Sequence, residues 1–212
     1  MAFRRYVLPG GIIGIYGAQR SGKTLLSYLI TQYVYDFYQK SYGEPIRVYS
    51  NLFVPDNPDI KITNVNSISE IPLDLKPKII VLDEIYNGTD ANDFRRLKDI
   101  SIFINTIGKQ NALFIYTSID DSMVYNRIRN QCNMIALVKK NNNEIYYRVV
   151  DPNTLAIRDF MVKKSPELFK RVHYDTNFIP LIFDWTMDSW QDKLRAFYKD
   201  NYNIELSDTY FK

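Results

Sequence analysis

Short apolar runs alternate with stretches of helical spacing along most of the chain. The apolar runs predict strands at residues 11–16, 46–50, 60–62, 79–82 and 112–117. Apolar positions recur with helical spacing at residues 25–38 and 94–109, and both segments are predicted to be helices. Strands that alternate with helices indicate a mainly parallel sheet with helices on both faces, so the predicted fold class is α/β.

The last third of the chain has a different pattern. Runs at 134–138 and 145–150, separated by an Asn turn at 141–143, predict an antiparallel hairpin at the edge of the sheet. From about Lys163 the chain is aromatic and mixed in charge. It has an aromatic stripe at roughly helical spacing, for which packing against the main domain is favoured over a partner groove. The stripe consists of Trp185, Trp190, Phe197 and Tyr198. We therefore predict a main domain at 1–162 and a helical, aromatic-rich C-terminal appendage at 163–212 packed on it.

An octet between the first strand and the first helix has the P-loop pattern G-x-x-x-x-G-K-[ST]. Gly17 and Gly22 permit the tight backbone path that turns successive N–H groups toward a phosphate, and the following helix adds its positive end. Lys23 is expected to reach the β and γ phosphates, and Thr24 to offer its hydroxyl to Mg²⁺. A chance match in such a chain has odds on the order of 1%. The motif predicts a P-loop NTPase three-layer sandwich that binds ATP with Mg²⁺. The predicted nucleotide-binding residues are Gly17, Ala18, Gln19, Arg20, Ser21, Gly22, Lys23, Thr24 and Leu25.

Two adjacent carboxylates, Asp83 and Glu84, follow the apolar run at 79–82. A buried parallel strand would deliver them at its C-terminal end, beside the P-loop. Asp83 is then placed to bind Mg²⁺ and Glu84 to act as general base toward the attacking water. Without other motifs, a pair of acids at a strand end is more often simply solvated. Because a P-loop lies upstream, we interpret Asp83 and Glu84 as residues of a hydrolytic site.

Composition limits the remaining classes. With 212 residues, 46% of them hydrophobic, the chain can bury a sizeable core. The single cysteine, Cys132, excludes an internal disulfide and fits a reducing compartment. No apolar run reaches about 18 residues, so no transmembrane helix is expected, and the N-terminus does not have the pattern of a secretion signal. The net charge of +3 permits a nucleic-acid partner but does not argue for one.

The residues after the strand at 112–117 point to a family. Many motor ATPases place a polar sensor at the end of the strand beside the acidic one, and here that position holds Thr117 and Ser118. The segment 119–130 resembles the one that follows the sensor strand in FtsK/HerA-type DNA motors and packaging ATPases. Together with both Walker motifs and the small size, the chain looks most like the viral genome-packaging NTPases of that superfamily, closest to those of Sulfolobus turreted icosahedral viruses. The resemblance covers residues 10–140, and only the Walker motifs are specific.

The resemblance implies a homo-oligomeric ring on double-stranded DNA that pushes the DNA into a preformed capsid with ATP. Capsid or portal-vertex proteins would be partners, and the host cytoplasm and the virion are the implied locations. The catalytic set would be Lys23, Glu84 and a sensor at Ser118. Because the superfamily usually has glutamine at that site, either Ser118 or Thr117 must do this work, or the sensor lies elsewhere.

A ring motor also needs a cation from a neighbouring subunit, which stabilises charge in the transition state. Each basic residue near the motifs is more often a solvated surface charge, so no single one stands out. The candidates are Arg95, Arg96, Lys109, Arg127 and Arg129. Loops facing the pore are not identified by the pattern, and residues 87–93 are one guess.

Three alternatives stay open. A Zot-like morphogenesis ATPase of filamentous phage shares the P-loop, a strand ending in an Asn like Asn51, and the Asp-Glu pair, but it usually carries a transmembrane helix and a periplasmic tail. A nucleotide or small-molecule kinase would need an arginine-bearing lid, and Glu84 argues against it. A nucleotide-binding scaffold with a degenerate site is disfavoured by the intact Lys23, Thr24, Asp83 and Glu84.

Overall fold

The computed structural model describes residues 10–52, 58–85, 94–173, 180, 182–187 and 190–211. The strands are β1 (Ile12–Tyr16), β2 (Arg47–Ser50), β3 (Ile62–Asn64), β4 (Lys78–Leu82), β5 (Ala112–Ser118), β6 (Met134–Lys140), β7 (Glu144–Val150) and β8 (Ile157–Lys163). The α-helices are α1 (Lys23–Tyr42), α2 (Phe94–Thr106), α3 (Asn126–Arg129), α4 (Pro166–Arg171) and α5 (Trp190–Tyr202), and short 3₁₀ turns are η2 (Ile68–Glu70), η3 (Asp121–Met123) and η4 (Asp208–Phe211).

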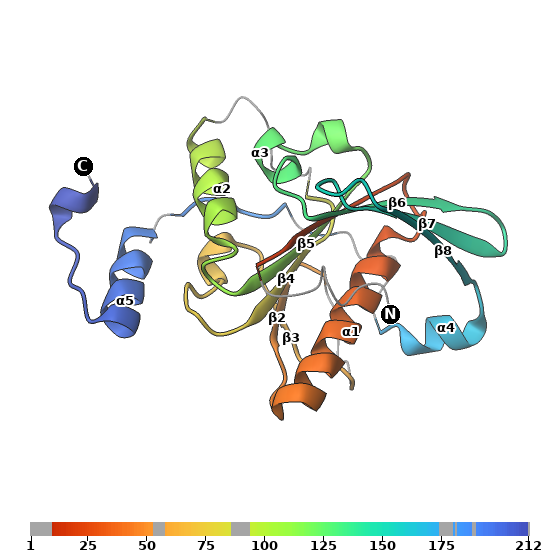
Figure 1. Cartoon of the computed structure of the whole chain (residues 1–212), viewed down its shortest axis with the longest axis horizontal. Helices are drawn as coiled ribbons and strands as arrows, with labels where there is room; N and C mark the ends of the chain where they lie inside the picture. Colours follow the sequence, from red (N-terminus) through yellow and green to blue (C-terminus); the bar gives the residue numbers. More distant parts are fainter. Residues whose placement is uncertain are drawn as a thin grey trace.

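The strands form one sheet in the order β3-β2-β4-β5-β1-β6-β7-β8. The pairs from β3 to β6 are all parallel, whereas β6–β7 and β7–β8 are antiparallel. Helix α1 covers one face of the parallel part, and α2 and α3 lie on the other (Figure 1). The three-layer α/β fold predicted from the sequence is confirmed.

Strand β5 separates the strand that leads into the P-loop from the strand that carries the acids. Tyr16 of β1 is in register with Ser118, and Leu82 of β4 is in register with Tyr116. The three strands are parallel, so their carboxyl ends meet at one edge of the sheet. The residues that follow β1, β4 and β5 therefore lie together there.

Two hydrophobic clusters fill the space on either side of the sheet. The alternation of side chains along each strand sends neighbouring residues to opposite faces, so Ile13 and Ile15 join one cluster and Ile12 and Tyr16 the other. The first cluster includes Leu25 from α1. The second includes side chains from α2 and α3 and from the C-terminal segment, namely Ile100, Phe103, Ile104, Ile128, Phe183 and Trp185.

The antiparallel hairpin predicted at this end of the sheet is confirmed as β6–β7, and β8, which was not predicted, pairs with β7 as the outermost strand. The structure corrects one expectation about the last third of the chain. Trp185 does not belong to a helical stripe. It lies in an extended segment whose Asp184 forms a parallel bridge with Ser67, and its ring is fully buried beside Phe103. The predicted division at residue 163 coincides with the last residue of β8 and stays a prediction.

Candidate functional site

The P-loop forms a tight turn between β1 and α1. Gly17 has a φ of 158°, and a Cβ there would lie 2.5 Å from the carbonyl oxygen of Val138 and 2.9 Å from Ser21 Oγ. Gly22 has a φ of 108°, in the left-handed region that disfavours side chains, and a Cβ there would press against Ile145 at 3.0 Å. Both glycines of the motif are therefore required by the backbone path and by close neighbours.

At the start of α1, hydrogen-bonding groups have no partner in the part of the chain that the structure describes. Its cap residue, Gly22, provides no side chain, and the first helical bond runs from Leu26 N–H to Gly22 O. The amides of the first turn have no acceptor within the helix. Ser21 Oγ is buried and has no hydrogen-bond partner among the described residues. Unsatisfied donors at a helix N-terminus fit an anion such as a phosphate group.

Lys23 is folded over this loop. Its side chain is buried, and Nζ donates hydrogen bonds to the carbonyl oxygens of Gly17 at 2.9 Å and Ala18 at 3.0 Å. Burial lowers the pKa of Lys23, and the nearby carboxylates of Asp83 and Glu84 act in the opposite direction. The ammonium group of Lys23 therefore lies at the P-loop, where it can exchange its hydrogen bonds to these carbonyl oxygens for hydrogen bonds to phosphate oxygens.

The carboxylate of Asp83 accepts hydrogen bonds from a threonine at the start of α1 and from another near the end of β5. Thr24 Oγ1 donates to both of its carboxylate oxygens at 3.1 Å, and Thr117 Oγ1 donates to Oδ1 at 2.6 Å. Burial raises the pKa of Asp83, while the hydroxyls of Thr117 and Thr24 act to lower it. A hydroxyl and a carboxylate oxygen side by side are the hard oxygen ligands that Mg²⁺ takes, with waters and phosphate oxygens completing its shell. The residues present therefore fit a magnesium ion.

Glu84 follows with an unusual backbone. Its φ is 52°, which is uncommon for a residue with a side chain, and its N–H donates to Thr117 Oγ1 at 3.0 Å. The next amide, that of Ile85, donates to the carbonyl oxygen of Thr117. Thr117 thus fixes the turn that presents Glu84, and backbone strain of this kind is concentrated at functional sites.

Asn51, at the end of β2, was not among the predicted site residues. Its Nδ2 donates to the carbonyl oxygen of Asp83 at 3.0 Å, and its Oδ1 accepts the N–H of Asp83 at 2.8 Å. Asn51 is buried. The only signal in the sequence was an asparagine directly after a strand, and its meaning depends on β2 lying next to β4.

The remaining residues predicted for nucleotide binding and sensing differ in their exposure. Ala18, Gln19 and Arg20 are exposed on the loop, whereas the side chain of Leu25 is in the core, so any phosphate contact of Leu25 would come from its N–H. Ser118 is buried, and its hydroxyl donates to Asp120 O at 2.9 Å. Of the two candidate sensor hydroxyls, it is that of Thr117 that bonds the carboxylate of Asp83, and it also accepts the N–H of Glu84.

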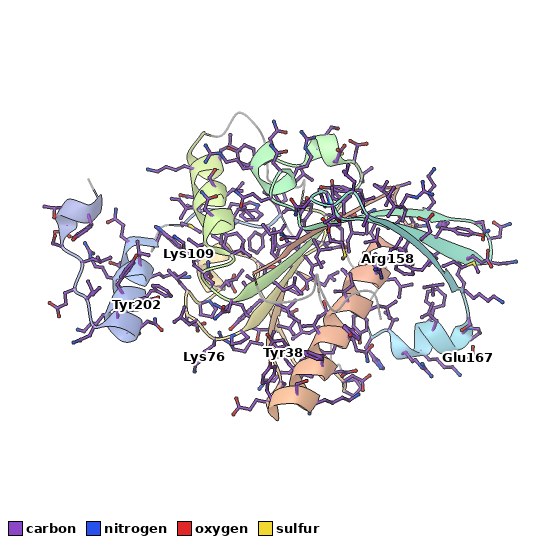
Figure 2. The ribbon with its side chains drawn as sticks, viewed as in Figure 1. Tyr38, Lys76, Lys109, Arg158, Glu167 and Tyr202 are labelled. Carbon is purple, nitrogen blue, oxygen red and sulfur yellow. The ribbon has the colours of Figure 1, made fainter. Side chains whose placement is uncertain are left out.

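The positions of the basic candidates do not identify which one would act as the cation in a neighbouring subunit's site. Lys109 is exposed in the turn before β5, near the opposite end of that strand from Thr117 (Figure 2). Arg127 is exposed on α3, and Arg129 bonds Asn126 Oδ1 at 2.7 Å. Arg95 and Arg96 are in the first turn of α2. The pore-loop guess at 87–93 lies outside the described residues.

Neither a family model nor a curated protein sequence matches the chain. Among solved structures, the N-terminal domain of zonular occludens toxin from Neisseria meningitidis matches with a TM-score of 0.55 at 16% identity, covering 79% of this chain and 100% of that one. The DNA-packaging ATPase B204 of Sulfolobus turreted icosahedral virus matches with a TM-score of 0.47 at 14% identity, covering 71% and 97%.

A third match is the flagellar accessory protein FlaH of Methanocaldococcus jannaschii, with a TM-score of 0.47 at 14% identity, covering 72% of this chain and 84% of that one. At 16% identity, the match to the zonular occludens toxin domain bears on the fold alone. With the P-loop and the strand order, it confirms the predicted α/β P-loop fold. In the part of the chain that the structure describes, no helix is long and apolar enough to cross a membrane.

Proposed function

We propose that the chain is an ATP-hydrolysing motor that translocates double-stranded DNA into a preformed viral capsid, working as a homo-oligomeric ring. The observation that carries the proposal is the position of Thr117 on β5, between the P-loop strand and the acidic strand. Its single hydroxyl contacts Asp83 and the backbone of Glu84, so a change at the phosphate end of the site can reach β5 directly.

In this proposal, each residue of the site has a separate role in hydrolysis. The first amides of α1 and Lys23 hold the triphosphate, while Thr24 and Asp83 hold Mg²⁺. When bound, the ion neutralises charge on the β and γ phosphate oxygens. Glu84 accepts a proton from the attacking water as the water oxygen bonds to the γ phosphorus and the bond to the β–γ bridging oxygen breaks, releasing ADP and phosphate. A cation from a neighbouring subunit would complete the site.

The translocating role comes from the family resemblance of the sequence, and one structural neighbour is a DNA-packaging ATPase. DNA, a capsid or portal-vertex partner, and the host cytoplasm or virion as location are all parts of this proposal. Because the net charge is only +3, we expect binding to duplex DNA to depend on several subunits acting together.

The first experiment measures ATP hydrolysis by the purified chain with and without long duplex DNA, at low and moderate salt. We expect duplex DNA to stimulate turnover, and the stimulation to weaken as salt rises. Glu84→Gln should still bind ATP and should lose turnover by a factor on the order of 10² to 10⁴. Wild-type turnover in Glu84→Gln would reject the general base, and turnover indifferent to nucleic acid would reject the motor.

A morphogenesis ATPase of the zonular occludens toxin type is the second candidate. It is supported by the fold match over 79% of this chain and by Asn51 at the end of β2. Hydrolysis that needs Glu84 but proceeds independently of any nucleic acid would favour this candidate over the packaging motor.

A further inference from the structure

The two glycines of the P-loop rest on the antiparallel part of the sheet. A Cβ at Gly17 would lie 2.5 Å from the carbonyl oxygen of Val138 on β6. A Cβ at Gly22 would lie 3.0 Å from Ile145 and 3.3 Å from the hydroxyl of Tyr147, both on β7. The P-loop is therefore closely packed on β6 and β7, on the side away from β5 and from the acids that follow β4.

Tyr147 makes a polar contact within this packing. Its hydroxyl donates to the carbonyl oxygen of Gly22 at 3.2 Å, where α1 begins beside β7 (Figure 1). The side chain is 1% exposed and belongs to the hydrophobic cluster that also contains Val138, Ile145 and Val149. A buried hydroxyl in apolar surroundings costs free energy unless it forms a hydrogen bond. The bond to Gly22 therefore gives a reason for a tyrosine, rather than a phenylalanine, at this place.

The ring of Tyr147 is itself held by strand β8. Val138, Tyr147 and Phe160 are in register across β6, β7 and β8. The rings of Tyr147 and Phe160 stack, with centroids 5.0 Å apart and planes 27° from parallel. Because a stacked ring in a packed row has little freedom to turn, the hydroxyl of Tyr147 is fixed relative to the sheet.

The carbonyl that Tyr147 holds belongs to the peptide between Gly22 and Lys23. The same oxygen accepts the first hydrogen bond of α1, from the N–H of Leu26 at 3.1 Å. Gly22 has a φ of 108° and no side chain, so its own conformation constrains this peptide only weakly. In a planar trans peptide the C=O and the following N–H point in opposite directions. A fixed Gly22 carbonyl therefore fixes the direction of the Lys23 N–H, one of the amides without an acceptor in the helix.

We infer that Tyr147 is a positioning residue for phosphate binding. Through the Gly22 carbonyl it directs the Lys23 N–H toward the phosphate groups, and Phe160 keeps its ring in place for this task. An amide that is oriented before the ligand arrives loses less freedom on binding, which raises affinity. The inference rests on the nucleotide site of the proposed function. It makes phosphate binding depend on β7 and β8, two strands outside the parallel part that carries the acids.

The test measures binding of ADP and of inorganic pyrophosphate to the full-length chain by calorimetric titration with Mg²⁺ and without DNA. Tyr147→Phe keeps the ring and removes the hydroxyl. Because the defect would lie at a phosphate-binding amide, we expect the affinity for both ligands to fall by the same factor, about 3- to 10-fold. In the nucleotide-free variant, the amide resonance of Lys23 should also shift.

The matched control is Tyr35→Phe. Tyr35 is a buried tyrosine of the same hydrophobic cluster, in the second half of α1. Urea unfolding of both variants measures what each hydroxyl contributes to stability. We expect Tyr35→Phe to bind both ligands within about twofold of wild type and to leave the Lys23 resonance in place, whatever its change in stability.

Phe160→Leu provides a second measurement, which also covers a Tyr147→Phe chain that does not fold. It keeps the hydroxyl but removes the ring that Tyr147 stacks on, so the affinity for pyrophosphate should fall about two- to fivefold. Combined with Tyr147→Phe it should cause no further loss, because both changes act through one hydroxyl. A full additional loss in the double variant, or unchanged affinity in Phe160→Leu, would overturn the role given to β8.

Three other results would overturn the inference as a whole. The first is wild-type affinity for pyrophosphate in Tyr147→Phe. The second is an equal loss of affinity in Tyr35→Phe, because that would reflect a general loss of stability. The third is a loss of ADP affinity without any loss of pyrophosphate affinity, which would move the effect away from the phosphate groups.

The outcome is separable from that of the proposed function. Both ligands bind without hydrolysis and without DNA, so Glu84→Gln chains should show the same dependence on Tyr147. Normal binding in Tyr147→Phe would sink only the positioning role. Hydrolysis that is indifferent to duplex DNA, with the effect of Tyr147 on binding intact, would sink only the motor.

Discussion

The side chain of Asn51 holds the main chain of Asp83 through a reciprocal pair of hydrogen bonds. Both partners are buried, at the adjacent ends of β2 and β4. Since the backbone groups of Asp83 are satisfied by Asn51, its carboxylate remains available to the hydroxyls of Thr24 and Thr117. Asn51 therefore acts as a positioning residue for the metal-binding carboxylate.

Replacing Asn51 by alanine should damage both stability and turnover. The N–H and the carbonyl of Asp83 would lose their buried partners, which costs about 2–3 kcal/mol in the free energy of unfolding. A displaced Asp83 should lower turnover about tenfold or more. Urea unfolding and ATP hydrolysis measure the two effects. Asn64→Ala, at the exposed end of the neighbouring strand β3, is the matched control and should change neither.

The two candidate sensor residues make different predictions. Thr117→Val removes the hydroxyl that contacts Asp83 and Glu84, so we expect turnover to fall about 10- to 100-fold, with ATP affinity changed much less. Ser118→Ala removes only a bond to Asp120 O, and its turnover should stay within about threefold of wild type. Steady-state kinetics with a separate nucleotide-binding measurement distinguishes them. A larger loss at Ser118 than at Thr117 would reverse the assignment.

Lys23→Ala should weaken binding of the triphosphate. The variant loses a buried ammonium group whose bonds to phosphate are each worth about 1.5–3 kcal/mol, so affinity for ATP should fall about 10- to 100-fold. Affinity for AMP should change little, because Lys23 is assigned to the β and γ phosphates. Calorimetric titration with both nucleotides checks this. Lys40→Ala, in the last turn of the same helix, should bind ATP like wild type.

The parallel part of the fold was predictable because its strands are buried on both faces. Strands such as β4 and β5 are fully buried, so they appear in the sequence as continuous apolar runs. The strand β8 was missed for the opposite reason. Arg158 and Asp159 interrupt its pattern, and only Phe160 and Val162 pack against the core. Edge strands with one uncovered face have no such clear signature.

The site was predictable where its chemistry is local in the sequence. Gly17 to Thr24 and the pair Asp83–Glu84 belong to contiguous motifs, so their residue types suffice to suggest their roles. The role of Asn51 could not be derived in that way, because it depends on β2 pairing with β4. The same holds for Thr117, whose contact with Glu84 requires the order β4-β5-β1 and the left-handed turn at Glu84.

Acid stability should depend on a charge cluster at the other end of β4. The guanidinium of Arg47 donates two hydrogen bonds to the carboxylate of Asp74, one of them from Nη1 to Oδ2 at 2.9 Å. The ammonium nitrogen of the buried Lys78 lies 3.0 Å from Asp74 Oδ1. Burial acts to raise the pKa of Asp74, but the hydrogen bonds and charges of Arg47 and Lys78 outweigh it and lower the pKa from 3.8 to about 2.

A lowered carboxylate pKa stabilises the folded state once the carboxylate of the unfolded chain is ionised. The contribution of Asp74 is therefore fully present above about pH 5 and is lost as the pH falls from about 4 through about 2. After allowance for solvent at this partly exposed site, it is on the order of 1–2 kcal/mol. We expect Asp74→Asn to be less stable than wild type at neutral pH, and the difference in urea unfolding free energy to shrink toward pH 2. Asp159→Asn, which breaks the exposed pair with Arg148, should show a smaller difference at every pH. A gap between wild type and Asp74→Asn that is equally large at pH 2 would show that the charge on Asp74 is not what stabilises this end of the sheet.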